Sequence, residues 1–469
     1  PAPDLARAIR MLIVPPDPNR TEAHDVNELA PETLGALYES LLPYFPRILR
    51  HDFETGSVLS RAKDPSRTER RRTGSYYTAR KLVVELVRSA LIPVLLDRLG
   101  REGLPVRSRA SARKGLFQDY RLLTRKERQK AERILLRSKV VDPACGGAVF
   151  LMTAQDFLAE ELLRLRYGQA TTSEPDKTKA FQDVMLHCIH GVDKDPLAVE
   201  LARISLWLNT GSCSLSREAM DSALKCGNAL LGYPLIKESV DSHAPTRQAC
   251  DQWTASFFQP AAPHRKSAGR IAEELRFFHW QIEFPPVFSG TDPGFDCVLG
   301  NPPWERIKLQ EREFFAGFAS PISQAGKASV RQGMIRCLKK QDPALYAYYQ
   351  QRHEYSMAFS RFLRTSKRYS LASRGDPNLY LFFAELSREL LAPKGRVGII
   401  VPSGIARIKA PALSSGISWR KGRSSVFTIS PTRSGSSLRL RARTVSACSP
   451  WPGRARRFAD PNSSSTPSR

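Results

Sequence analysis

Three short motifs carry acidic, amide and small residues at positions where parallel strands would end. V-V-D-P-A-C-G-G-A-V-F-L runs from Val140 to Leu151, and H-G-V-D-K-D-P-L-A-V-E-L-A-R runs from His190 to Arg203. The third, G-F-D-C-V-L-G-N-P-P-W, runs from Gly294 to Trp304. In each, an apolar run meets a polar residue and then a turn, which predicts strand ends that meet at one edge of a sheet.

The first motif predicts a turn that can approach a ligand closely. Asp142 ends a short apolar strand, and the small residues Ala144 and Gly146 precede a helix over 149–165. Small residues leave backbone N–H groups accessible, as they are in nucleotide sites. The motif is neither G-x-G-x-x-G nor a Walker loop, because the Walker lysine is missing. On its own, such a turn is more often only a tight connection between two elements.

The second motif places a carboxylate at the end of the strand predicted over 189–192. There Asp193 can accept hydrogen bonds from both hydroxyl groups of a ribose. Asp195 precedes Pro196 and is expected to cap the helix over 196–208. A helix cap would be the simpler interpretation of either aspartate alone. The neighbouring first motif favours the ribose role for Asp193.

The third motif supplies hydrogen-bond acceptors and an aromatic ring. The amide oxygen of Asn301 and the carbonyl of Pro302 can both accept from an exocyclic amine, which raises the electron density on its nitrogen. Pro302 and Pro303 stiffen the turn because each fixes φ at about −65°. Trp304 offers a flat face for a base flipped out of a duplex. A proline turn beside a core tryptophan would explain N-P-P alone, but the three motifs together favour the chemical role.

The elements around the motifs alternate between strand and helix. Apolar runs predict strands over 139–141, 189–192, 295–299 and 396–401, and apolar spacing predicts helices over 29–42, 80–99, 149–165, 196–208 and 379–391. This succession predicts an α/β fold with a mostly parallel sheet. We divide the chain into an N-terminal helical segment (1–67), a catalytic domain (68–405) with an exposed basic insertion (101–132), and a low-complexity basic tail (406–469).

Charge points to a polyanionic partner. The 469 residues include 72 Lys and Arg against 46 Asp and Glu, a formal net charge of +26, so nucleic acid is the expected partner class. The tail from Ala406 holds 13 of these cations against one acid, Asp460. We expect the tail to be disordered, and a slipped reading frame near Ala406 would also explain its texture. Arg70 to Arg72 and the insertion are candidate phosphate contacts, with a solvated face as the equal alternative.

The eight cysteines are scattered, with no C-x-x-C pair and no zinc-finger spacing. No metal site is predicted, and His187, His190 and His279 are expected to be core or surface histidines. No apolar run reaches the length of a membrane span, and the first residues lack the pattern of a signal peptide. We therefore expect a cytoplasmic protein without a membrane partner.

The motifs, in this order, resemble those of gamma-class N6-adenine DNA methyltransferases, found in type IIG restriction-modification enzymes and BREX-type phage-defence methylases. D-P-A-C-G-G-A-V-F-L is similar to the family's methyl-donor loop and G-V-D-K-D-P-L-A-V-E-L-A-R to its ribose motif. L-G-N-P-P-W-E-R-I-K is similar to its catalytic motif, and R-T-G-S-Y-Y-T, residues 72–78, to the segment before the donor loop. The resemblance covers roughly residues 25–405.

The resemblance implies a class I, Rossmann-like methyltransferase fold and S-adenosyl-methionine as the cofactor. By that resemblance, Thr78, Asp142, Ala144 and Gly146 contact the methionine end, Asp193 the ribose and Asn228 the adenine, while Asn301, Pro302, Pro303 and Trp304 hold the target base. It implies transfer of a methyl group to N6 of an adenine flipped out of double-stranded DNA. It also implies restriction or phage-defence proteins as partners. Nothing after Ile405 resembles the family's target recognition domain, so we expect little sequence selectivity.

Three residues depart from the family pattern, and two other functions stay open. Ala79 stands where the family has proline, Ala148 where the donor loop often has a second glycine, and Asn228 where many relatives have aspartate. The amide oxygen of Asn228 can still accept a hydrogen bond. One alternative is a methyltransferase that acts on protein glutamine or on RNA. The other is a catalytically dead, truncated DNA-binding remnant.

Overall fold

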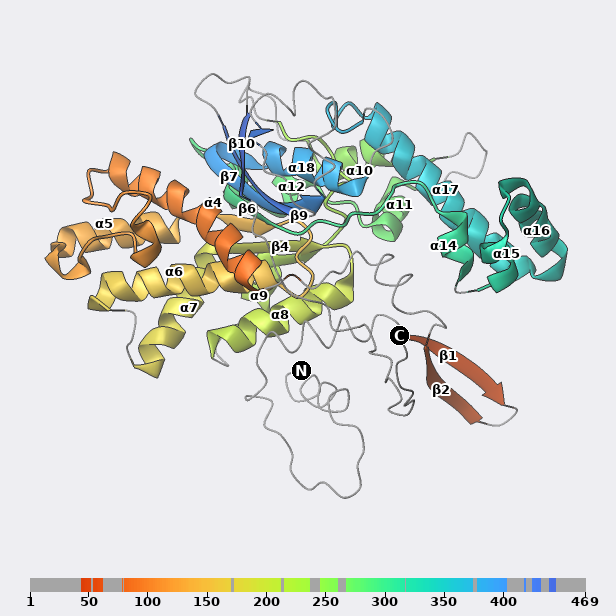
Figure 1. Ribbon diagram of the computed structural model, residues 1–469, viewed down its shortest axis with the longest axis horizontal. Helices are drawn as coiled ribbons and strands as arrows, with labels where there is room; N and C mark the ends of the chain where they lie inside the picture. The colour runs from red at the N-terminus through yellow and green to blue at the C-terminus, as the bar shows by residue number, and fades with distance from the viewer. Residues whose placement is uncertain are drawn as a thin grey trace, which may run out of the picture.

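The computed structural model (Figure 1) describes residue 78 and residues 80–169, 173–211, 215–236, 245–259, 267–316, 318–373 and 378–402. Outside these ranges it gives the backbone of five strands. These are β1 (Tyr44–His51), β2 (Glu54–Arg61), β8 (Ile417–Ser418), β9 (Ser424–Pro431) and β10 (Leu438–Arg443). The helix expected over 29–42, the cations Arg70 to Arg72 and Ala79 lie outside the described residues.

A parallel sheet forms the centre of the described chain. Its strands are β3 (Val140–Asp142), β4 (Ile189–Asp193), β5 (Leu224–Cys226), β6 (Phe295–Gly300) and β7 (Leu391–Pro402). They lie in the order β5-β4-β3-β6-β7, and each neighbouring pair is parallel. The chain order reverses between β3 and β6, as in doubly wound Rossmann-like sheets, where ligands bind at this switch point. The predicted α/β fold class is confirmed.

Alternate residues of the strands enter two hydrophobic cores. Val140, Cys297 and Leu299 belong to the first core, whereas Val141 and Val298 belong to the second. Because successive side chains of a strand point to opposite faces, the near-continuous apolar runs bury both faces of the sheet. The three motifs therefore begin on strands that are packed on both sides.

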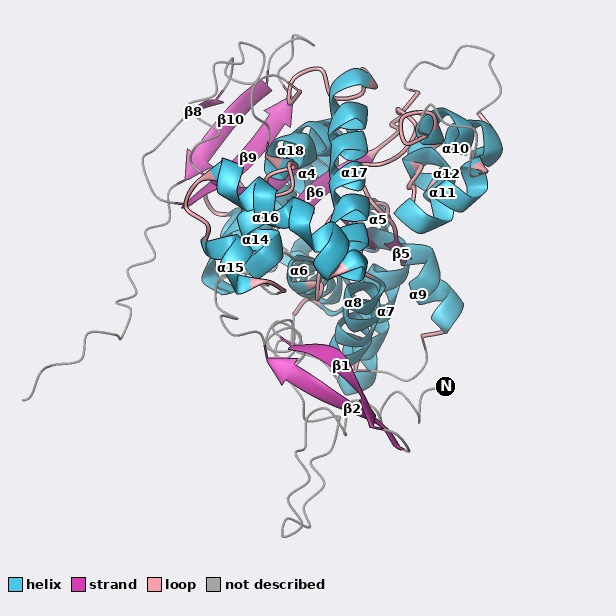
Figure 2. Cartoon of the chain, turned by 90° about the vertical axis from the view of Figure 1, so that its right-hand side faces the viewer, coloured by secondary structure: helices cyan, strands magenta, loops and turns pink. Residues whose placement is uncertain are grey.

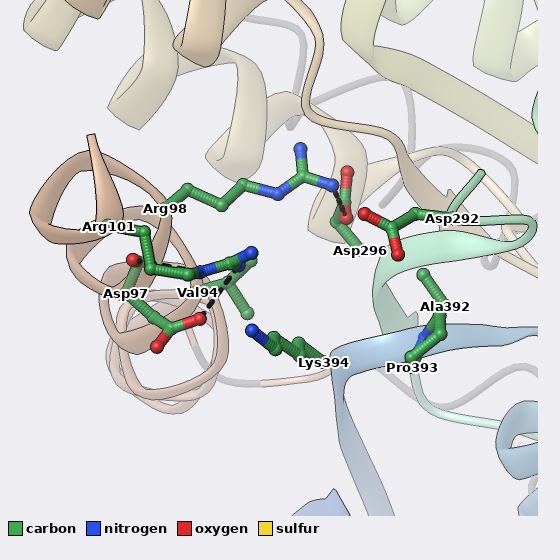
Figure 3. A pocket seen from close by; sticks show the side chains of 9 residues that line it. All are labelled: Val94, Asp97, Arg98, Arg101, Asp292, Asp296, Ala392, Pro393 and Lys394. Atoms are coloured by element: carbon green, nitrogen blue, oxygen red, sulfur yellow. Dashed lines mark hydrogen bonds and ion pairs between the residues drawn. The ribbon is translucent and has the colours of Figure 1, made fainter. Parts of the chain in front are cut away.

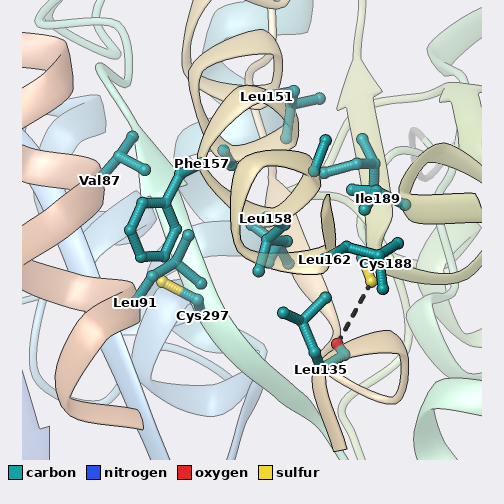
Figure 4. Packing of buried hydrophobic residues seen from close by; sticks show 14 of the residues in the cluster. Val87, Leu91, Leu135, Leu151, Phe157, Leu158, Leu162, Cys188, Ile189 and Cys297 are labelled. Carbon is teal, nitrogen blue, oxygen red and sulfur yellow. Dashed lines mark hydrogen bonds between the residues drawn. The ribbon is translucent and has the colours of Figure 1, made fainter. Parts of the chain in front are cut away.

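Six α-helices of the described chain pack in the first core, which Figure 4 shows from close by. They are α4 (Arg80–Arg101), α5 (Arg125–Leu136), α6 (Val149–Tyr167), α7 (Glu174–Cys188), α8 (Pro196–Thr210) and the short α9 (Arg217–Ala223), which precedes β5. Sequence explains their starts: Thr124 and Glu127 form a capping box on α5, and Asp195 caps α8 by accepting from the Leu197 N–H, as predicted.

The second core contains helices from later in the chain. They are α10 (Arg247–Ala255), α11 (Ala268–Leu275), α12 (Trp280–Glu283), α13 (Pro285–Phe288) and α18 (Leu379–Glu389). Between β6 and α18 the chain forms four more helices, which we call the arm. These are α14 (Glu311–Ala316), α15 (Ser320–Gln324), α16 (Ala328–Gln341) and α17 (Pro343–Thr365). In Figure 1, α14 to α16 lie at the opposite end of the molecule from α5.

The insertion over 101–132 is not exposed throughout, which corrects the sequence-based expectation. Leu116 and Phe117 are fully buried in the first core, and Tyr120 is 7 % exposed. The Tyr120 hydroxyl donates to the buried Glu161 of α6, which also accepts from the Leu116 N–H. The many cations of the insertion led to the prediction of an exposed segment, because they outnumber the few apolar residues that are buried.

The two ends of the chain also differ from expectation. Within the segment expected to be helical, β1 and β2 pair antiparallel. Within the tail expected to be disordered, β9 pairs antiparallel with β7 and with β10. Both segments contain Val, Ile, Leu, Thr or Phe in short runs, and such residues favour strands. No helix of the described residues is long and apolar enough to cross a membrane.

Candidate active site

Four neighbouring strands place predicted site residues at the same edge of the sheet. Asp142 ends β3, Asp193 ends β4, Asn228 follows β5 by two residues, and Asn301 follows β6 directly. Since these strands are parallel and adjacent, their carboxyl ends meet at one edge. Thr78 reaches the same edge from the residues before α4, because its side chain contacts Asn301.

Asp142 is buried and lacks a partner for one of its oxygens. It is 1 % exposed, and its Oδ1 accepts from the Ala144 N–H at 3.0 Å. Its Oδ2 is buried with no hydrogen-bond partner. Burial raises the pKa of this carboxyl to about 8; the Ala144 N–H opposes the shift and the charge of Asp193 adds to it. Asp142 is therefore largely protonated at neutral pH when its surroundings hold no cation.

The backbone of Gly300 lies directly against the Asp142 carboxyl group. Gly300 has φ of 148°, and a Cβ atom there would stand 2.6 Å from Asp142 Oδ1. Any side chain would strain the backbone and displace the carboxylate. The glycine of G-N-P-P-W thus brings the ends of β3 and β6 into contact at the switch point.

Asn301 is held at one end of its amide and unpaired at the other. Its Nδ2 donates to Thr78 Oγ1 at 3.2 Å. Its Oδ1 is buried with no hydrogen-bond partner. Leaving a buried acceptor unpaired costs roughly 1–3 kcal/mol, so such a group indicates a site that a ligand completes. Thr78 fixes which end of the amide is free.

The loop between β3 and α6 leaves room where a cofactor would approach. Gly146 has φ of 49°, and a Cβ atom there would meet nothing within 4 Å. Its N–H donates to Asp193 Oδ2 at 2.9 Å, which joins the loop to β4. Ala144 is partly exposed beside it. The loop therefore combines open space with a hydrogen bond that fixes its position.

Ala148, the last residue of this loop, has a left-handed backbone. Its φ is 66° and its side chain is fully buried. Its N–H donates to the Cys145 carbonyl at 2.8 Å, which closes the turn before α6. A left-handed conformation costs an L-residue roughly 1–2 kcal/mol. Ala148 thus strains the loop at the position where the family often has glycine.

Asp193 is fixed by two backbone donors. Its Oδ1 accepts from the Asp195 N–H at 2.9 Å and its Oδ2 from the Gly146 N–H. Each carboxylate oxygen keeps one lone pair, which leaves two acceptors for a pair of hydroxyl groups. Burial raises the pKa of Asp193, and the two N–H donors oppose that shift.

Asn228 lies between its own loop and the arm. Its Oδ1 accepts from the Leu230 N–H at 3.3 Å. Its side chain also lies against the hydroxyl of Tyr355 of α17; burial raises the pKa of that tyrosine, and Arg352 and Asn228 oppose the shift. The Asn228 oxygen retains one lone pair for a ligand. No sequence pattern marks Tyr355, which follows Asn228 by more than a hundred residues.

The two prolines and the tryptophan complete the edge. Pro302 is buried, and Pro303 and Trp304 are partly exposed. Trp304 packs against both cores, and its indole N–H donates to the Ile400 carbonyl at 3.4 Å. The ring is therefore anchored to β7 without being enclosed. The turn remains accessible from outside, as a base-binding role requires.

S-adenosyl-methionine fits the residues at this edge. The unpaired Asp142 Oδ2 can receive an ammonium group, Asp193 can receive two hydroxyl groups, and a Cβ atom at Gly146 would meet nothing within 4 Å. Metal binding has no comparable support, because the described residues contain no group of three or more His, Cys, Asp or Glu side chains placed to hold an ion. His279 contacts Asp251 and the Tyr233 N–H, and is a core histidine.

A small cavity lies at the opposite edge of the sheet (Figure 3). It lies between the end of α4 and the starts of β6 and β7, where Arg98 pairs with Asp296. Its volume of about 10 Å³ is room for one water molecule. The Asp296 Oδ2 also accepts from the Lys139 N–H at 2.8 Å. This ion pair anchors the far end of α4, whose near end follows Thr78.

Two solved structures resemble the chain at low similarity. The type IIL restriction-modification enzyme MmeI, in complex with DNA, has a TM-score of 0.34 and 14 % identity, over 85 % of this chain and 39 % of that one. The DrdV–DNA complex has a TM-score of 0.33 and 11 % identity, over 80 % of this chain and 23 % of that one. In both cases the chain spans well under half of the larger protein.

Sequence comparisons agree with the motifs at the edge of the sheet. A curated protein of Methanocaldococcus jannaschii, the putative type II restriction enzyme and methyltransferase RM.MjaORFECS2P, is 25 % identical over 227 residues. The match covers 45 % of this chain and 17 % of that protein, so the chain spans about a sixth of its length. Residues 187–352 match the family described as Eco57I restriction-modification methylase. The segment that contains Asp193, Asn228 and Asn301 is therefore similar to restriction-modification methylases.

Proposed function

We propose that this protein transfers a methyl group from S-adenosyl-methionine to N6 of an adenine extruded from duplex DNA, in a cytoplasmic restriction-modification or phage-defence system. The observation that carries the proposal is the buried, unpaired Oδ1 of Asn301, whose amide is oriented by Thr78 at the end of β6, together with the unpaired Oδ2 of Asp142 at the end of the neighbouring β3. The family match over 187–352 supports the same reaction class.

The cofactor would be held by residues from the β3–β5 half of the sheet. Asp142 and the loop at Ala144 and Gly146 would bind its methionine end, Asp193 its ribose and Asn228 its adenine. When bound, it supplies a methyl group activated on a cationic sulfonium. Asp142 changes state on binding, because a cation beside its Oδ2 favours the ionised carboxylate over the protonated form.

The target base would be held by residues that follow β6. Asn301 Oδ1 and the Pro302 carbonyl accept from the exocyclic amine, which directs the nitrogen lone pair toward the methyl group. Trp304 stacks on the base and stays in place because Ile400 holds its indole N–H. Fixing both reactants in this orientation supplies most of the acceleration, so no residue needs to act as a base before transfer.

The decisive experiment is transfer from a methyl-labelled donor to unmethylated duplex DNA, followed by digestion and identification of the labelled nucleoside. We expect label in N6-methyladenine. Transfer to RNA or to protein glutamine instead would contradict the proposal. DNA binding without any binding of S-adenosyl-methionine in calorimetry would identify an inactive remnant.

A matched pair at Thr78 tests how Asn301 is oriented. Thr78→Ser keeps the hydroxyl that accepts from Asn301 Nδ2, and Thr78→Val removes it at nearly the same volume. We expect Thr78→Val to lower kcat about tenfold and Thr78→Ser to change it little. Equal activity of both variants would show that this hydrogen bond does not position the amide.

A further inference from the structure

The arm contrasts with the rest of the fold because it forms a small core of its own. Phe315, Ile322, Ile335, Leu338 and Tyr349 are buried together there. In Figures 1 and 2, α14, α15 and α16 lie to one side of the sheet and α17 connects them to it. The helices α14 to α16 thus present a helical surface beside the sheet, while Phe359, Phe362 and Leu363 of α17 are buried in the second core.

The arm is strongly basic. From Glu311 to Lys367 the sequence holds ten Lys and Arg against four Asp and Glu. Some of these cations have structural partners: Arg331 pairs with Glu311 at 2.8 Å, and Arg312 donates to two backbone carbonyls. Much of the remaining charge is not used to hold the arm together.

Besides Arg312, seven exposed cations between Glu311 and Lys367 pair with no carboxylate among the described residues, and five of them lie within α16 and α17. These five are Arg336, Lys339, Lys340, Arg352 and Arg361, and we call them the arm cations. Arg336, Lys339 and Lys340 are spaced i, i+3 and i+4, so they share one face of α16. Arg352 and Arg361 are nine residues apart on α17 and therefore lie on different faces of it, so the shared face of α16 is the surface whose unpaired cations suit a phosphate backbone.

The arm is fixed to the candidate site at the middle of α17. Ser356 Oγ donates to the Ile307 carbonyl at 2.8 Å and accepts from the Leu309 N–H at 3.0 Å. Ile307 is only three residues beyond Trp304. One residue before Ser356, Tyr355 contacts Asn228. The arm therefore begins where the target base would be held.

The length of the arm suits a duplex that leaves this site. Asp342 stands at the start of α17, and Ser356 lies near its middle. The helix between them is about 21 Å long, and about six base pairs of duplex have the same length. Arg336, Lys339 and Lys340 lie just before Asp342, at the far end of the arm. The three cations of α16 thus lie roughly half a helical turn of DNA away from the site.

From this placement, and resting on the proposed function, we infer that the arm is a docking surface for the phosphate backbone of the duplex on one side of the extruded base. The cations bind without reading sequence, since phosphate contacts fix register and orientation only. The other basic surface that could contact the DNA phosphates is the insertion over 101–132. A Cβ atom at Gly168, which follows α6, would stand 3.2 Å from the Arg121 side chain of the insertion. That end of α6 is about 28 Å of helix away from the donor loop.

The test compares two triple charge reversals in the full chain. The arm variant is Arg336→Glu, Lys339→Glu and Lys340→Glu. The control is Arg121→Glu, Arg125→Glu and Lys126→Glu, three exposed cations of the insertion, so both variants change the net charge equally. Binding of a fluorescent duplex of about 30 base pairs is measured over a range of salt concentrations, and thermal unfolding checks that each variant folds.

We expect the arm variant to bind DNA at least tenfold more weakly and to lower the slope of log K against log salt concentration by about 2 to 3, with a much smaller change in the control. Equal losses in both variants would overturn the inference, because net charge alone would then explain binding. Unchanged binding by the arm variant, or no DNA binding by the unmodified chain, would also overturn it.

Two further measurements separate this inference from the proposed function. A milder arm variant, with Gln in place of the same three cations, should lose affinity in the same direction; if it does not, contact with phosphate is excluded. If the arm variant loses DNA binding while the unmodified chain transfers no methyl group to DNA, the docking surface stands and the proposed function fails. If a second copy of the chain covers the arm instead, the arm variant will change the oligomeric state and leave DNA binding unaltered, which overturns the inference.

Discussion

The helices beside the cofactor half of the sheet and the helices of the arm carry opposite charge balances. Between Val149 and Ala223 the sequence has seven Lys and Arg against eleven Asp and Glu, whereas between Glu311 and Lys367 it has ten against four. The first region suits a small cationic ligand and the second suits a polyanion. The two regions meet at the switch point between β3 and β6.

The regions also differ in how their charges are used. In the first, Arg166 pairs with Glu132 and Asp183, and Arg203 pairs with Glu200 and Asp221. Such pairs leave little positive charge for an external partner. In the arm, the exposed cations of α16 have no such pairs with described residues. A net charge of +26 therefore does not mean a uniformly basic surface, and the location of the unpaired cations is more informative.

The largest effect is expected at the boundary between the two regions. Asn301→Ala removes the acceptor that orients the target amine, so we expect kcat to fall about 10²- to 10³-fold. DNA affinity should change little, because the arm cations are intact. Labelled methyl transfer and duplex binding, measured on the same preparation, check both statements. If the variant still transfers methyl groups at the normal rate, Asn301 does not take part in the reaction. If it loses DNA binding, the proposal that the arm rather than the cofactor half binds DNA is wrong.

Part of the pH dependence of stability should come from Asp142, in the cofactor half of the sheet. The Asp142 pKa is about 8 in the folded chain against an ordinary value of 3.8, so the folded state holds a proton that the unfolded state releases between these values. Stability should therefore fall as pH rises through this window, by up to about 1.4 kcal/mol per pH unit, and the loss should end above about pH 8.

Asp142→Asn should make that dependence shallower, since the amide keeps the shape of the side chain without titrating, while the other buried carboxyls with a raised pKa, such as Asp193, remain. Denaturant unfolding at about pH 5 and about pH 8, with and without the substitution, measures the difference. An unaltered slope in Asp142→Asn would show that another group titrates.

Alanine substitutions at two glycines with similar backbone angles distinguish backbone strain from a loss of ligand contact. Gly146 has φ of 49° and Gly103 has φ of 76°, and a Cβ atom at either position would meet nothing within 4 Å. Alanine at each should cost roughly 1–2 kcal/mol of stability. Only Gly146→Ala should weaken binding of S-adenosyl-methionine, by about tenfold or more, in calorimetry. Equal affinities in the two variants would exclude Gly146 from the cofactor site.

The smallest expected effect tests whether the arm influences cofactor binding through its contact with Asn228. Tyr355→Phe removes the hydroxyl by which the arm contacts Asn228, so cofactor affinity should fall by about threefold to tenfold. Tyr349→Phe is the control, because its hydroxyl bonds Glu311 within the arm at 3.2 Å. A loss of affinity in both variants would attribute the effect to loosening of the arm rather than to the Asn228 contact.

The sequence predicted well the features that depend on neighbouring residues. The apolar runs that end at Asp142, Asp193 and Asn301 are local, and parallel strands must bring such ends to one edge, so the fold class and the edge followed from pattern alone. The apolar anchors of the insertion and the strands near both termini were not predicted. In these segments cations, serine and proline outnumber the few apolar residues that decide the structure.

What the sequence determined by itself is which residue types end the strands and which turns follow them, because backbone preferences act over a few residues. Only the tertiary structure decided their partners. Thr78 contacts Asn301 across 223 positions, Arg98 pairs with Asp296 across 198, and Tyr355 reaches Asn228 from the arm. Such contacts depend on how two cores pack against the same sheet, and no spacing along the chain encodes that arrangement.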